Sequence, residues 1–306
     1  MLIIAHRGAS ALRPEHTRSA YALAFSQGCD FVEPDLVMSR DGVPVIRHEN
    51  EISGTTDIAD HAEFADRRRI KTIDDQRLDG WFTEDFTLAE LKTLRGRERL
   101  PELRPQNTAY DGRDPILTFD ELLDMAAEAG VGVYAELKHP TWFRALGLPL
   151  EEAVAKALEA RGWTGPEAPV ILESFEPRAV QRLKAMTGCR TGQLIALEGR
   201  PHGGSEMTYE QMLAPRGLAR LRAWADAIGP DKAWLERRPQ LVADAHAAGL
   251  QVHCWTVRPE NAFLPEDLRR GADPATHGDM VGELARAKAL GVDGVFCDLP
   301  GAAQSV

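Results

Sequence analysis

Short apolar runs alternate with helical patterns along the whole chain, and this alternation constrains the fold more than any other feature of the sequence. The runs are rich in Val and Ile and are bounded by Gly, Pro or Asp, as buried strands are. They occupy residues 2–5, 31–37, 131–137, 170–175, 191–197, 225–229, 251–257 and 294–297. Strand–helix alternation implies a parallel sheet with right-handed crossovers, and eight units favour closure. The predicted fold is therefore an α/β (β/α)8 barrel, or TIM barrel.

Helix boundary signals separate the predicted strands. Thr118 and Glu121 form a capping-box pattern ahead of an apolar stripe. Several predicted helices are each followed directly by a glycine, as Gly130 follows the helix at 118–129. A helix often ends at a residue in the left-handed conformation, which glycine adopts readily. The predicted helices cover residues 17–27, 118–129, 149–161, 177–186, 239–248 and 279–290.

One polar segment interrupts this rhythm. Residues 49–115 are rich in Arg and Asp and carry only brief helical hints. A loop this long in a compact domain is usually a functional lid or a small subdomain. We therefore expect a single barrel domain over residues 1–306, with an inserted subdomain at 49–115 after the second strand.

Charge and hydropathy exclude several classes of partner. The chain has 36 basic and 47 acidic residues, a formal net charge of −11. This balance argues against nucleic acid or an anionic membrane surface, and a small diffusible substrate fits better. No apolar run of about 18 residues occurs, so no membrane-spanning helix is predicted.

The N-terminal residues and the cysteines bear on the compartment. The first residues lack the basic start, long apolar stretch and cleavage site of a secretory leader, so a cytoplasmic location is expected, or a periplasmic one if a leader was trimmed. The four cysteines lack paired spacing, which indicates buried free thiols. The oligomeric state is left open by the sequence.

His6 and Arg7 directly follow the first predicted strand. Side chains at the carboxyl ends of barrel strands line the active site, so both residues lie where chemistry is expected. The guanidinium of Arg7 offers a fixed fork of donors that suits phosphate oxygens.

Carboxylates follow the next two strands. Glu33 and Asp35 are two residues apart and so face the same way, and Glu136 stands two residues before Lys138 on the third strand. Three carboxylates facing a barrel interior repel one another unless a cation neutralises them. Oxygen ligands favour a hard ion such as Mg²⁺ or Ca²⁺. Lys138 is expected to meet a phosphate oxygen.

A second histidine returns toward the same end of the barrel. A tight turn at Asp41 and Gly42 and a short return strand bring His48 back toward His6. With ordinary pKa values near neutrality, two histidines can serve as general base and acid. Trp255, near the end of the seventh strand, either walls an organic group or packs in the core.

These motifs resemble those of the glycerophosphodiester phosphodiesterase family. They occur in the same order as in that family, along nearly the whole chain. The matching segments are HRG at 6–8, PEHT at 14–17, ExD at 33–35, DGVPV at 41–45 with His48, ELK at 136–138, HxWTV at 253–257 and DGVFCDLP at 293–300. The segment after His48 is similar to the insertion that marks this family among related barrels. Two departures occur: Glu49 and Asn50 follow His48 where many members have Asp, and Arg258 follows WTV where Asn is usual.

The resemblance implies a function and a set of roles. It implies metal-dependent hydrolysis of glycerophosphodiesters to sn-glycerol 3-phosphate and an alcohol. It assigns general base and acid to His6 and His48, phosphate binding to Arg7 and Lys138, and a Ca²⁺ or Mg²⁺ ion to the three carboxylates.

Two alternatives to this function stay open at the level of sequence. The first is a lysophospholipase D or sphingomyelinase D, which resembles the barrel in its histidines and metal ligands but takes a lipid. The second is a catalytically silent binding protein on the same scaffold.

Overall fold

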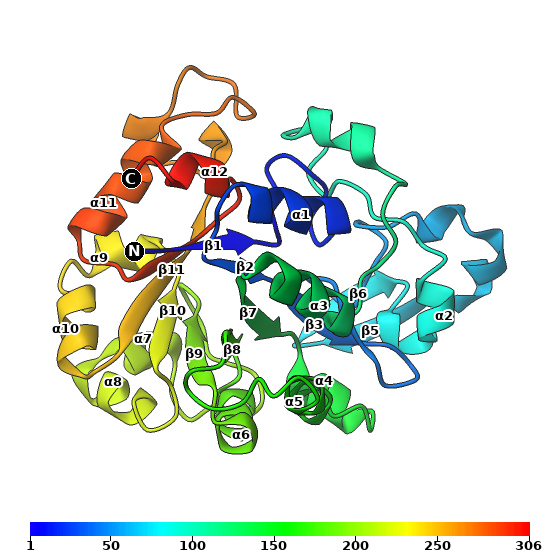
Figure 1. Ribbon diagram of the computed structural model, residues 1–306, viewed down its shortest axis with the longest axis horizontal. Helices are drawn as coiled ribbons and strands as arrows, with labels where there is room; N and C mark the ends of the chain where they lie inside the picture. The colour runs from blue at the N-terminus through cyan, green and yellow to red at the C-terminus, as the bar shows by residue number, and fades with distance from the viewer.

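Eight parallel strands close into a barrel in the computed structural model, which describes residues 1–306 (Figure 1). The closing contact is between β2 and β7, so the sheet has no free barrel edge. This confirms the predicted (β/α)8 barrel. In order around the barrel, the strands are β1 (Leu2–His6), β2 (Phe31–Glu33) continued by β3 (Asp35–Met38), β7 (Gly132–Leu137), β8 (Val170–Ser174), β9 (Arg190–Ile195), β10 (Ala227–Pro230), β11 (Gln251–Val257) and β12 (Gly294–Cys297).

The second barrel strand is interrupted at Pro34, where the sequence predicted one continuous run. Proline has no N–H to donate to a sheet. The chain therefore pairs as two short pieces. β2 lies beside β1 and β7, whereas β3 lies beside β7 and the antiparallel strand β4 (Pro44–Ile46). The interruption leaves Asp35 directly opposite Glu136 in the parallel register.

Helices cover the outside of the barrel, and the predicted ones are present (Figure 1). At the start of α3 the Thr118 side chain accepts from the Glu121 N–H in the expected capping box, and Gly130 ends that helix with φ of 66°. The α-helices around the barrel are α1 (Arg18–Ser26), α3 (Phe119–Ala129), α4 (Pro140–Ala145), α5 (Leu150–Glu159), α6 (Pro177–Thr187), α7 (Tyr209–Leu213), α8 (Pro215–Leu221), α9 (Ala233–Arg237), α10 (Leu241–Ala247), α11 (Met280–Ala289) and α12 (Pro300–Ala303).

A small apolar cluster fills the barrel interior beneath the polar end. It consists of Ile4, Phe31, Tyr134, Ile171 and Phe296, all buried. Every second residue of a barrel strand faces the interior. Two residues further along the same strands, the interior side chains are polar or charged. The cluster thus forms the apolar bottom of the barrel interior, below the polar side chains.

The elements of residues 49–115, the segment predicted to be an insertion, lie beside the barrel, in the cyan part of Figure 1. The segment follows β4 (Pro44–Ile46), which pairs antiparallel with β3. Its two-stranded sheet was not predicted, because the side chains of β5 are mostly exposed and the strand has no buried apolar run. The segment contains β5 (Arg69–Ile73), β6 (Gln76–Gly80), α2 (Leu88–Leu91) and the 3-10 turns η1 (Ile58–Asp60), η2 (Ala62–Arg67), η3 (Thr83–Asp85) and η4 (Pro105–Tyr110).

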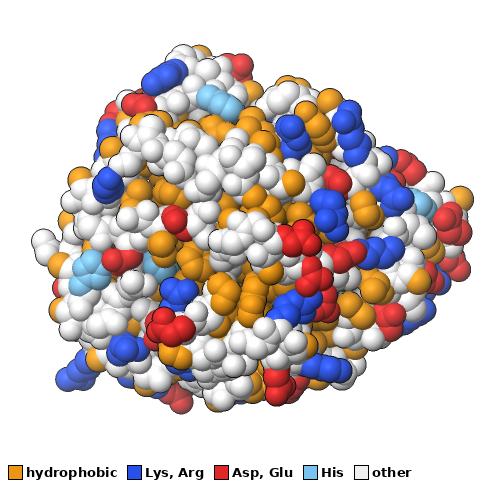
Figure 2. Space-filling view, in the orientation of Figure 1, with side chains coloured by type: hydrophobic (Ala, Val, Ile, Leu, Met, Phe, Trp, Pro, Cys, Tyr) orange, Lys and Arg blue, Asp and Glu red, His pale blue; other side chains and the backbone are white.

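The surface carries mixed charge. Figure 2 shows acidic and basic side chains interspersed on the viewed face, without a broad field of one sign. No helix combines the length and apolar character needed to cross a membrane.

Candidate active site

A cavity of about 300 Å³ opens at the carboxyl ends of the barrel strands. We call it the catalytic pocket. Seven of the eight residues predicted from the sequence line it: His6, Arg7, Glu33, His48, Glu136, Lys138 and Trp255. The eighth, Asp35, lies with Glu33 and Glu136 in a cluster of carboxylates. The structure therefore brings all of the predicted side chains together.

The HRG turn owes its shape to glycine. Arg7 and Gly8 both have positive φ, 60° and 84°. A Cβ on Gly8 would lie 2.7 Å from the backbone carbon of Ala20, so only glycine fits against α1. This turn lets the Arg7 N–H donate to the Glu33 carboxylate at 2.9 Å.

Arg7 is held by carboxylates on two sides. Its Nη1 donates to Glu15 at 2.9 Å and its Nε lies 3.3 Å from Asp35 Oδ2. Asp35 is fixed in turn by the Nε2 of His16 at 2.9 Å. The PEHT motif thus places two side chains, Glu15 and His16, that orient the predicted phosphate and metal ligands.

Three buried carboxylates can hold a cation. Glu33, Asp35 and Glu136 each offer an oxygen, and these oxygens lie within 4.8 Å of one another. Burial and the neighbouring Asp35 raise the pKa of Glu33 well above its ordinary value, and burial raises the pKa of Glu136 to about 8. Asp35 Oδ1 has no hydrogen-bond partner, and Glu136 Oε1 has the ammonium of Lys138 at 2.8 Å. A divalent cation would neutralise this cluster and could take oxygens of all three carboxylates as ligands.

Lys138 borders both the carboxylates and a histidine. Its Nζ lies 2.8 Å from Glu136 and 3.7 Å from Asp35, and 3.3 Å from the Nε2 of His48. The ammonium group is therefore part of the polar wall of the catalytic pocket.

Each of the two predicted catalytic histidines has a carboxylate partner at Nδ1. His6 pairs with Asp298 at 2.6 Å, and His48 pairs with Glu49. Burial and the nearby Arg7 lower the pKa of His6 to about 4 and that of His48 to about 3. Both rings are therefore neutral near pH 7, with the Nδ1–H donating and Nε2 left as the acceptor.

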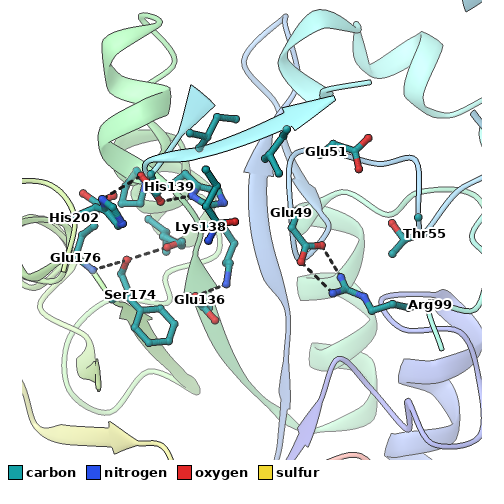
Figure 3. A pocket seen from close by; sticks show the side chains of 18 of the residues that line it. Glu49, Glu51, Thr55, Arg99, Glu136, Lys138, His139, Ser174, Glu176 and His202 are labelled. Atoms are coloured by element: carbon teal, nitrogen blue, oxygen red, sulfur yellow. Dashed lines mark hydrogen bonds and ion pairs between the residues drawn. The ribbon is translucent and has the colours of Figure 1, made fainter. Parts of the chain in front are cut away.

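Arg99 fixes the partner of His48. Its Nη1 and Nη2 donate to the two oxygens of Glu49 at 3.0 and 2.6 Å (Figure 3), and Nη2 also lies 2.7 Å from Glu15. The acidic residue at position 49 thus supplies the carboxylate partner of His48. Arg99 comes from the segment 49–115, which therefore contributes to the site.

Arg104, from the same segment, binds the carboxylate partner of His6. Its Nη2 donates to Asp298 at 2.5 Å and its Nε to Glu260 at 2.6 Å. Sequence reasoning missed Asp298, Arg104 and Glu260. Asp298 directly follows β12, and its place at a strand end is the signal that could have identified it. Arg104 lies in an irregular polar stretch that gives no such signal.

Replacing Arg104 with methionine is expected to lower the free energy of unfolding by about 3–5 kcal/mol, because Glu260 is then buried without its cation and Asp298 keeps only one cationic partner, Arg258, at the longer distance of 3.4 Å. Urea denaturation measures this loss. Arg286→Met, which breaks an exposed pair with Asp267, is the matched control and should change stability by less than about 0.5 kcal/mol. Equal stability of the two variants would contradict this account of the network.

A second cavity, of about 560 Å³, adjoins the catalytic pocket and is shown in Figure 3. We call it the hairpin pocket, because Ile73, Gln76 and Leu78 of the β5–β6 hairpin line one side. It shares Glu136, Lys138 and Phe175 with the catalytic pocket. The carboxylates of its walls are those of Glu49, Glu51, Asp74, Glu136 and Glu176.

Trp255 and His253 have different positions although both lie on β11. The Trp255 Nε1 donates to the Gly229 carbonyl at 2.7 Å, and its ring packs edge-on against Phe175 on the wall of the catalytic pocket. His253 is fully buried and hydrogen-bonded to Tyr134 at 3.0 Å, which is a core position.

A (β/α)8 barrel with paired histidines, two cationic side chains and a carboxylate cluster in one pocket is a phosphoric diester hydrolase in class. Residues 6–302 match the family described as the glycerophosphoryl diester phosphodiesterase family. The chain belongs to this family.

Named relatives cover nearly the whole chain. A glycerophosphodiester phosphodiesterase of Arabidopsis thaliana is 35% identical over 320 residues, which is 97% of this chain and 83% of the relative. One of Haemophilus influenzae is 29% identical over 98% of this chain and 87% of its own length.

Solved structures share the fold. A phosphodiesterase structure from Silicibacter pomeroyi, described as a glycerophosphoryl diester phosphodiesterase, superimposes with a TM-score of 0.72 at 25% identity, over 100% of this chain and 92% of that one. A phosphodiesterase of Oleispira antarctica, solved in complex with the product sn-glycerol-3-phosphate, has a TM-score of 0.68 at 24% identity, over 100% of this chain and 96% of that one.

Proposed function

We propose that this protein hydrolyses small glycerophosphodiesters to sn-glycerol 3-phosphate and an alcohol, with the aid of a divalent cation. The observation that carries this proposal is the pair of histidine–carboxylate dyads, His6–Asp298 and His48–Glu49, beside three buried carboxylates. The name of the Arabidopsis relative and the product bound by the Oleispira antarctica enzyme support the same substrate class.

Arg7 and Lys138 are the phosphate ligands in this proposal. Both line the catalytic pocket and both are charged, buried and held by carboxylates. The planar guanidinium donates to two phosphate oxygens and the ammonium to a third. Their charge stabilises the negative charge that develops on the phosphoryl oxygens during reaction.

His6 and His48 move the protons. His6, neutral and fixed by Asp298, removes a proton at Nε2 from the attacking hydroxyl group. That group belongs either to water or to the substrate's own 2-hydroxyl, and a cyclic phosphate in rapid-quench samples would identify the second route. His48 protonates the leaving alcohol oxygen, because the anionic substrate beside it raises its pKa.

Glu33, Asp35 and Glu136 would hold the cation, for which Ca²⁺ and Mg²⁺ are the candidates because all three ligands are oxygen donors. When bound, the ion supplies Lewis-acid stabilisation of charge on the phosphate. The protein's own contribution is to keep the three carboxylates together in a buried position against their mutual repulsion.

A lipid phosphodiesterase of the lysophospholipase D or sphingomyelinase D kind is the competing function. The carboxylates that line the hairpin pocket disfavour an acyl chain. The test is to compare glycerol 3-phosphate release from glycerophosphocholine with choline release from lysophosphatidylcholine. We expect turnover of the first substrate, and turnover of only the second would overturn the proposal.

The hairpin pocket is the proposed site of the alcohol portion. Replacing Ile73, Gln76 and Leu78 with alanine should then change the ratio of kcat/KM for glycerophosphocholine and glycerophosphoinositol by about fivefold or more, because the contacts to the alcohol are lost. Alanine at Ile70 and Arg77, exposed residues of the same hairpin, is the control. An unchanged ratio in the triple variant would remove the hairpin from substrate selection.

A further inference from the structure

Glu173 is a fourth carboxyl group in the catalytic pocket, and the mechanism above gives it no role. It lies on β8 directly opposite Glu136 and Gly192 in the strand registers. Its side chain lines the catalytic pocket and is about 1% exposed. Its Oε2 is buried without a hydrogen-bond partner. A buried polar atom of this kind needs an explanation, since nearly all such atoms in folded proteins are paired.

Two glycines lie beside this carboxyl group. A Cβ on Gly192 would lie 3.5 Å from Glu173 Oε2, and one on Gly229 would lie 3.7 Å from it. These positions on the next two strands therefore add no side chain of their own, and the nearest side-chain atoms to them are the Tyr134 hydroxyl and a methyl group of Leu194. The carboxyl group borders a cavity, because Glu173 lines the same pocket as the catalytic histidines.

Glu173 is not one of the clustered cation ligands, although Glu136 is its register partner on β7. The oxygens that lie within 4.8 Å of one another are those of Glu33, Asp35 and Glu136. The wall of the same pocket also carries apolar side chains, those of Phe175, Leu194 and Trp255 among them. A polar ligand with a short carbon chain fits this combination, because its carbons can pack on the aromatic rings while a hydroxyl group reaches the carboxyl.

We infer that Glu173 recognises the glycerol part of the substrate by hydrogen bonding to its terminal hydroxyl group, at C1. The inference rests on the proposed function and assigns a specificity-determining residue to it. A hydroxyl group can both donate and accept, so it satisfies Glu173 whether the carboxyl is ionised or neutral. An unpaired buried carboxyl group destabilises the free protein, and such a departure from the usual pairing is typical of a binding site.

The test crosses two substrates with two forms of the full-length protein. The substrates are sn-glycero-3-phosphocholine and 2-hydroxypropyl phosphocholine, which keeps the 2-hydroxyl group and lacks the terminal one. The proteins are the wild type and Glu173→Met, a variant of similar size without the carboxyl. Choline release gives kcat/KM for each of the four combinations.

We expect the wild type to prefer the complete substrate by about tenfold or more, and Glu173→Met to lose that preference, since each change removes the same hydrogen bond. Glu173→Gln, whose amide can still accept, should keep part of it. The thermal midpoint of Glu173→Met should not fall, because no protein partner is lost. Glu151→Gln is the control: that carboxylate is buried but paired with Arg144 and Arg182, so stability should fall and the preference should stay.

The outcomes separate this inference from the proposed function. A wild type that releases choline from both substrates equally well overturns the inference and leaves the function standing, and this result needs no variant. A preference that survives unchanged in Glu173→Met overturns the inference as well. Release from neither substrate, with either ion present, overturns both.

Discussion

Alanine at His6 is expected to lower kcat for glycerophosphocholine by about 10²–10⁴-fold, the range that a general acid or base contributes. The KM should change little, because the phosphate ligands Arg7 and Lys138 stay in place. The physical reason is that the Nε2 of His6 is the neutral acceptor in the pocket, fixed by Asp298 at Nδ1. Steady-state release of glycerol 3-phosphate measures the effect.

A histidine outside the pocket provides the control for this variant. His246 pairs with Asp293 at the surface, so alanine there should leave kcat within about twofold of the wild type. Activity of His6→Ala equal to that of the wild type would exclude the acid–base role. No activity in either protein would favour the catalytically silent binding protein on this scaffold.

Asparagine at Asp35 is expected to abolish cation binding and to lower kcat by about 10³-fold. The substitution removes one of three clustered ligands and also the carboxylate that His16 and Arg7 hold in place. A ligand that binds only the folded state stabilises it by an amount that grows with the logarithm of the ligand concentration over Kd. Ca²⁺ or Mg²⁺ should therefore raise the thermal midpoint of the wild type and leave that of the variant unchanged. Calorimetric titration with each ion gives the affinity directly.

The control for this charge change is Asp66→Asn, an exposed carboxylate in the segment 49–115. It should bind the cation as the wild type does. If Asp35→Asn bound the ion with undiminished affinity, the carboxylate cluster would not be the cation site.

The barrel was predictable because its strands are short, buried and apolar. The run at 251–257 and the run at 294–297 have the bounds of β11 and β12, and the capping box at Thr118 marks the start of α3. Prediction was poorer where the local sequence pattern does not reflect the structure that forms. The β5–β6 hairpin has exposed side chains on both strands and is held by its backbone pairing, which leaves no apolar period to detect.

The catalytic pocket was predictable where its residues follow strands in recognisable motifs. His6, Glu33, Asp35 and Glu136 are of this kind, because the carboxyl ends of barrel strands converge. Arg99 and Arg104 are not, since each reaches the pocket from an irregular segment and only the tertiary fold brings it to Glu49 or Asp298. Glu173 also follows the strand rule, but one carboxylate at a strand end is weak evidence until its missing partner is seen.

The most direct measurement is release of glycerol 3-phosphate from glycerophosphocholine after treatment with EDTA and again after Ca²⁺ or Mg²⁺ is restored. The account predicts loss of release on chelation and its recovery with one of the two ions, because three buried carboxylates need a cation to stay ionised together. Release that persists at full rate in EDTA would contradict a cation site at Glu33, Asp35 and Glu136. No release with either ion would contradict the proposed hydrolysis itself.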